Sequence, residues 1–60
     1  MMRWFDYGHL PDDLREVSRL FGELAQRVED ALPGCWQKTL ALQKLLEAKD
    51  CAVRARIEAR

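Results

Sequence analysis

The chain begins its helical pattern at residue 11, where hydrophobic residues start to recur in alternating steps of three and four. That spacing is typical of one face of an amphipathic α-helix. The face consists of Leu14, Val17, Phe21, Leu24, Val28 and Ala31, widened by Leu20, Ala25 and Leu32. Ser18 falls mostly outside it. Pro11 is tolerated in a first helical turn, and Asp12 and Asp13 suit the positive end of the helix dipole, so we predict a helix over about 11–32.

A short link separates this helix from a second one. Pro33 disfavours helical geometry at Leu32, and Gly34 tolerates the backbone of a tight connection. Links of this length join antiparallel neighbours. Because neither proline nor glycine interrupts the chain beyond this point, we predict a second helix over about 35–59.

The second helix carries two apolar stripes that lie about 100° apart around its axis. The first stripe consists mainly of small residues: Ala41, Leu45, Ala48, Ala52, Ala55 and Ala59. The second stripe consists of Leu42, Leu46, Val53 and Ile57. Lys49 falls inside the second stripe and Arg56 falls between the two. Asp50 and Arg54 are spaced as a favourable acid–base pair on the polar face.

The first helix has one principal apolar face, so it can cover only one of these stripes well. An uncovered apolar stripe usually marks association. We therefore predict that the second stripe, Leu42, Leu46, Val53 and Ile57, is the interface with another copy of the chain.

The first ten residues form an aromatic arm without helical period. Trp4, Phe5 and Tyr7 lie close together, and a glycine follows them. Two roles stay open for this arm. Its aromatic rings fold back to cap the open end of the hairpin, or Tyr7 and His9 contact a ligand by stacking on a base or by hydrogen bonding to a phosphate.

Small size points to assembly as the source of stability. The chain has 60 residues, 48% of them hydrophobic, and forms one domain over 1–60. A core of this size supplies about 3–5 kcal/mol, and disulfides, metals or oligomers usually add the rest.

Cys35 and Cys51 are 16 residues, or roughly 24 Å of helix, apart, too far for an internal disulfide. We expect both to be reduced and packed as small hydrophobic residues. His9 stands alone, so we expect neither a metal nor a cofactor.

Charge and hydropathy exclude several classes of protein. Ten acidic residues balance ten basic residues, which argues against a long nucleic acid as partner. No apolar run reaches about 18 residues and no signal peptide is recognisable, so we expect a cytoplasmic protein without a membrane partner. A single histidine and the absence of a glycine-rich phosphate loop argue against an enzyme. The predicted fold is all-α: a two-helix antiparallel hairpin with an aromatic N-terminal arm, assembled as a homo-oligomer.

Several stretches together resemble a known family. They are Phe5-Asp6-Tyr7, Leu24-Ala25, a proline-containing turn, and TLALQKLLEAKDCAVRA, which ends at Ala55. This pattern resembles the small helical-hairpin domain of phage proteins that counter the bacterial CBASS and Thoeris defences. The resemblance implies a sponge, hexameric in the anti-CBASS case, that acts in the cytoplasm of an infected bacterial host. It implies sequestration, without cleavage, of a cyclic oligonucleotide or a cyclic ADP-ribose-type signal between subunits.

A pocket for such a signal needs cations for phosphates and flat groups for bases. Lys49 and Arg56 are the best phosphate candidates because they lie beside the predicted interface, and both can instead send their charges to solvent. Arg54, Tyr7 and His9 complete the predicted ligand-binding set. The alternative function is a small oligomeric structural or adaptor protein that binds a protein partner.

Overall fold

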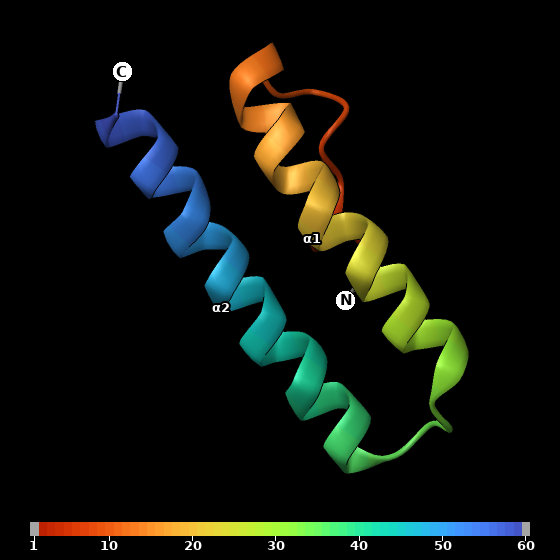
Figure 1. Ribbon diagram of the computed structural model, residues 1–60. Coiled ribbons are helices and arrows are strands. Elements are labelled where there is room, and N and C mark those ends of the chain that lie inside the picture. The colour runs from red at the N-terminus through yellow and green to blue at the C-terminus, as the bar shows by residue number, and fades with distance from the viewer. Residues whose placement is uncertain (1, 60) are drawn as a thin grey trace.

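The computed structural model describes residues 2–59. They form two long antiparallel α-helices (Figure 1) and a short 3₁₀-helix. The elements in chain order are η1 (Met2–Phe5), α1 (Asp12–Ala31) and α2 (Trp36–Glu58). The predicted all-α hairpin of two helices is confirmed, and the described part of the chain contains no strand. Each end predicted for the two long helices lies one residue outside the observed end.

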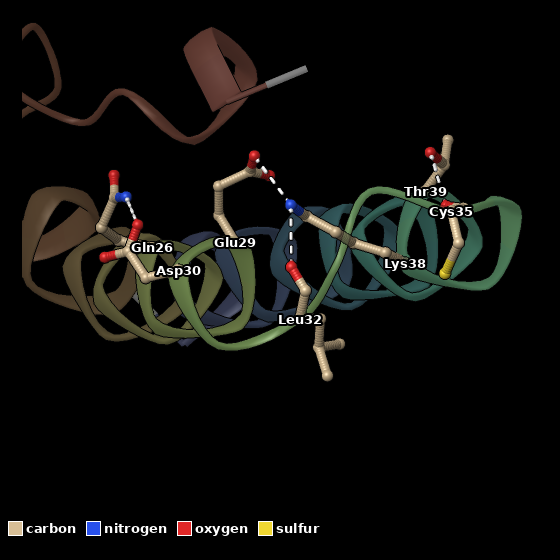
Figure 2. Close-up of polar contacts among 7 residues, drawn as sticks. All are labelled: Gln26, Glu29, Asp30, Leu32, Cys35, Lys38 and Thr39. Carbon is tan, nitrogen blue, oxygen red and sulfur yellow. Dashed lines mark hydrogen bonds and ion pairs between the residues drawn. The ribbon is translucent and has the colours of Figure 1, made fainter.

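The link between the helices is held by local geometry and by one lysine. Leu32 is extended, with φ −111° and ψ 147°, as expected for a residue that precedes proline. Lys38 Nζ lies 3.0 Å from Glu29 Oε1 and donates a hydrogen bond of 3.3 Å to the Leu32 carbonyl oxygen (Figure 2). A cation at this place suits the negative end of the α1 dipole. Lys38 therefore ties the start of α2 to the end of α1.

The core is small and draws on all three elements. Phe5 of η1, Ala25 of α1 and Leu42 of α2 are buried together. The partly buried residues packed against them are Met2, Phe21, Val28, Leu45 and Leu46. The arm is therefore part of the core, although its sequence shows no helical period.

The buried face of α1 is rotated relative to the predicted one. Leu14, Ser18 and Ala25 are buried, whereas Leu20 and Leu24 are exposed. The expectation that Ser18 lies outside the apolar face is wrong, because its side chain is 0% exposed. The physical reason is that α1 meets both α2 and the arm, so its buried face turns toward the arm and away from Leu20 and Leu24.

On α2, the stripe predicted to meet another copy mostly faces inward. Leu42 is 3% exposed, Leu46 packs against the core, and Val53 is half-buried. Ile57 is the exposed member of this stripe. Leu42 and Leu46 thus lie in the hairpin's own interior, while most of the alanine stripe, represented by Ala48, is exposed.

Both cysteines are free and exposed. Cys35 directly precedes α2, and Cys51 lies about 180° from Leu42 around the helix, on the side away from the core. The prediction that the cysteines pack as small hydrophobic residues is therefore wrong. Within the described residues, neither α1 nor α2 has a stretch long and apolar enough to cross a lipid bilayer.

Candidate functional site

The arm folds back along the side of the hairpin and is held at three points. Phe5 is buried in the core. A Cβ placed on Gly22 would lie 3.0 Å from Tyr7 Cε1 and 3.1 Å from the Phe5 carbonyl oxygen, so the arm passes very close to α1. Lys49 Nζ donates a 2.6 Å hydrogen bond to the Trp4 carbonyl oxygen. These contacts lie in the middle of α1 and α2, so they hold the arm against the side of the hairpin.

A pocket of about 580 Å³ lies between the arm and the two long helices. We call it the arm pocket. Its lining residues are Arg3, Trp4, Asp6, His9, Leu10, Ser18, Lys49, Asp50, Val53 and Arg54. Pockets that hold small organic ligands typically measure about 300–1,000 Å³, so the arm pocket is large enough for a nucleotide-sized molecule.

The arm pocket brings together three of the five predicted ligand-binding residues. His9 comes from the arm, and Lys49 and Arg54 come from α2. Tyr7 lines a separate pocket of about 340 Å³ on the other side of the arm and packs against α1. Arg56 is exposed near the end of α2 and does not line the arm pocket.

The two cations that α2 contributes to the pocket, Lys49 and Arg54, differ in how many contacts their side chains already make. The side chain of Lys49 is 12% exposed; besides bonding to Trp4, its Nζ lies 3.8 Å from Asp50 Oδ1 and 5.9 Å from the centre of the Phe5 ring. The predicted ion pair between Asp50 and Arg54 is absent among the described residues. Arg54 is exposed and has no partner in that part of the chain. Arg54 is therefore the better placed cation for a phosphate, and Lys49 mainly holds the arm.

Arg3 and Trp4 also line the arm pocket, although the sequence pattern did not predict a ligand-binding role for them. The guanidinium carbon of Arg3 lies 5.2 Å from the centre of the Trp4 ring, a cation–π distance. The Trp4 ring is exposed beside the pocket. Together they offer a flat surface and a cation of the kind that binds bases and phosphates. The adjacent Arg3 and Trp4 near the start of the arm are the signal that points to them.

Ser18 contributes an unusual polar group to the pocket wall. Its Oγ atom is buried and has no hydrogen-bond partner among the described residues, although the residue lines the arm pocket. Buried hydroxyl groups are normally hydrogen-bonded, and an unpaired one destabilises the fold. The Ser18 hydroxyl is thus an unsatisfied polar group within the wall of the arm pocket.

Replacing Ser18 by alanine is expected to raise the free energy of unfolding by about 1–2 kcal/mol, because the change removes an unpaired buried hydroxyl and raises helix propensity. Urea unfolding followed by circular dichroism measures this. Thr39→Ala is the matched control, since the Thr39 hydroxyl is exposed and bonds to the Cys35 carbonyl oxygen. A Ser18→Ala protein that is less stable than the wild type would contradict the prediction.

Comparison with protein-family models, curated proteins and solved structures finds no match to this chain. The assignment of a function therefore depends on the arm pocket and its chemistry.

Proposed function

We propose that this protein is a sponge that sequesters a cyclic nucleotide signal without cleaving it, in a pocket within one chain and not between subunits as the resemblance to phage counter-defence proteins implies. The arm pocket is the observation that carries the proposal. It combines the guanidinium of Arg54, which has no partner among the described residues, with the Arg3–Trp4 pair. A cyclic nucleotide presents the complementary groups, namely anionic phosphates and flat bases.

Each part of the pocket has a role in this proposal. Arg54 and Arg3 bind phosphate oxygens through their planar guanidinium groups. The exposed ring of Trp4 stacks on a base. The exposed His9 forms hydrogen bonds to the remaining polar atoms. Lys49 keeps the arm in place through the Trp4 carbonyl oxygen.

Sequestration fits these groups better than catalysis does. The Ser18 hydroxyl makes no hydrogen bond to His9 or to any other described residue, so it lacks the base that a serine nucleophile requires. The Asp6 carboxylate accepts a 3.3 Å hydrogen bond from the backbone N–H of Gly8, which gives it a local structural role. The groups present bind and orient a ligand.

Thermal unfolding with a panel of ligands tests the proposal. The panel consists of cyclic dinucleotides, cyclic trinucleotides and cyclic ADP-ribose isomers, with inorganic phosphate and a linear mononucleotide as controls. A ligand at 100 times its Kd adds about 2.7 kcal/mol of stability, which raises the Tm of so small a domain by roughly 10 °C or more. The recovered ligand should be chemically unchanged. A folded protein with no shift across the panel would refute the sponge and favour an adaptor function.

Replacing Arg54 by alanine is expected to lower the affinity for the active ligand by about 10- to 100-fold, because a hydrogen bond to a charged group contributes about 1.5–3 kcal/mol. Titration calorimetry measures the change. The control is Arg27→Ala, which removes another exposed arginine, on α1, outside the arm pocket. Equal affinities for the Arg54→Ala protein and the wild type would place the ligand elsewhere.

A further inference from the structure

The side of α1 that faces away from the arm carries exposed leucines that no described residue covers. Gly22 marks the arm side, because Tyr7 packs against it. Leu20 and Leu24 each lie two residues from Gly22, and a step of two residues turns a side chain by about 160° around a helix. Both leucines are exposed. At the end of α1, the exposed side chain of Leu32 also points away from the N-terminal segment (Figure 2).

The corresponding side of α2 carries small residues. Asp50 marks the arm side of this helix, because it lines the arm pocket. Ala48 and Ala52 each lie two residues from Asp50, again about 160° around the helix. Ala41 lies one heptad before Ala48 and thus nearly in line with it. Ala41 and Ala48 are exposed, and Ala52 is half-buried.

We propose that this uncovered surface is where two copies of the chain pair. We call it the arm-free face, and it consists of Leu20, Leu24 and Leu32 beside Ala41, Ala48 and Ala52. Large side chains occupy one half of the surface and small ones occupy the other. A two-fold axis along the hairpin sets α1 of each copy on α2 of the other, so that the leucines of one copy pack on the small alanine side chains of its partner. The product is a four-helix assembly.

The dimensions of the chain agree with a second copy as the occupant. Its Cα atoms extend over 39 × 18 × 14 Å, so a long face measures roughly 550–700 Å² before side chains are added, close to the ~800 Å² per partner of a standard interface. Within one chain only Phe5, Leu14, Ala25 and Leu42 are buried hydrophobic residues among those described. Pairing of the arm-free faces gives the chain the additional core that so small a domain needs.

This arrangement differs from the interface predicted from the sequence. Ile57, the exposed residue of that predicted interface, lies seven residues after Asp50 and therefore within about 20° of it around α2. It belongs to the arm side of the molecule. The proposed pairing leaves Ile57 and the arm pocket outside the contact, so ligand binding and assembly are separate properties.

Sedimentation of the full chain at micromolar concentration tests the pairing. Leu24 is 49% exposed and Ile57 is 46% exposed, so Leu24→Glu and Ile57→Glu place the same charge at equally accessible positions on opposite sides. We expect the wild type to sediment as a multiple of the chain mass. Leu24→Glu should weaken the association at least 100-fold, whereas Ile57→Glu should sediment like the wild type. Circular dichroism at the same concentration verifies that the variants are helical.

A second pair of variants tests the alanine half of the face. Ala48→Arg places a long charged side chain where the partner's leucines pack and should dissociate the assembly, while Gln43→Arg, on another side of α2, should not. A wild type of single-chain mass would overturn the proposal, and so would an assembly that survives both Leu24→Glu and Ala48→Arg. Dissociation by Ile57→Glu alone would instead support the stripe predicted from the sequence. None of these outcomes depends on whether the arm pocket binds a nucleotide.

Discussion

Replacing Phe5 by alanine is expected to abolish cooperative folding of this protein at room temperature. Phe5 is 3% exposed and joins the arm to both long helices through Ala25 and Leu42. Truncating a buried phenylalanine costs about 3–5 kcal/mol, and a core of this size supplies only about 3–5 kcal/mol in total. Circular dichroism during heating should show a broad, early loss of helix in place of a single transition.

The adjacent aromatic residue provides the control. The ring of Trp4 is mostly exposed, and its contact with Lys49 is made by the backbone oxygen, which alanine retains. Trp4→Ala should therefore cost less than about 1 kcal/mol, as most exposed substitutions do. If the Phe5→Ala protein unfolds at the wild-type temperature, the arm contributes nothing to the core.

The helices were predictable because their signals are local. Pro11, Pro33 and Gly34 bracket the apolar periodicity, and each acts on the backbone within one or two residues. The choice between the two stripes of α2 was not predictable in this way. Periodicity places Leu42 and Ala41 about 100° apart, but which of them faces α1 depends on what else covers α1. The arm is the element that decides this, and it contacts residues of α1 and α2 that are far from it in the sequence.

The arm pocket was only partly predictable for the same reason. His9, Lys49 and Arg54 were singled out by their chemistry, and the structure brings them together. Tyr7 was expected either to cap the hairpin or to contact a ligand, but it packs on Gly22. Gly22 itself was the missed signal. A glycine in the middle of an otherwise regular helix lowers helix propensity, and it commonly marks a place where another segment approaches the backbone closely.

The close approach at Gly22 leads to the second prediction. Replacing Gly22 by leucine is expected to displace the arm from the hairpin and to eliminate ligand binding. The Cβ atom alone would lie 3.0 Å from Tyr7 Cε1 and 3.1 Å from the Phe5 carbonyl oxygen. That oxygen belongs to the backbone of η1, so it cannot be relieved by a change of side-chain rotamer. The larger leucine side chain must therefore take the place that the arm occupies.

The Gly22→Leu substitution should affect helix α1 and the arm in opposite ways. Leucine improves the helix propensity of α1 by about 0.8–1 kcal/mol relative to glycine, so helix formation in α1 itself is favoured. The arm, in contrast, loses its docking surface, and five arm residues of the pocket leave with it: Arg3, Trp4, Asp6, His9 and Leu10. Phe5 leaves the core with the arm, but the leucine side chain fills part of the vacated space, so we expect the hairpin to keep its helices with a loss of at least about 2 kcal/mol of stability.

Limited proteolysis and ligand titration distinguish this outcome from simple unfolding. Trypsin should cut Gly22→Leu after Arg3 much faster than the wild type, before it cuts within α1 and α2. Gly34→Leu is the matched control, because a Cβ atom there meets no atom within 4 Å and the backbone of Gly34 does not adopt a positive φ. It should keep both the protected arm and the ligand affinity. A Gly22→Leu protein with a protected arm and wild-type affinity would show that the arm is not seated against α1, and the pocket assigned to that contact would then have no basis.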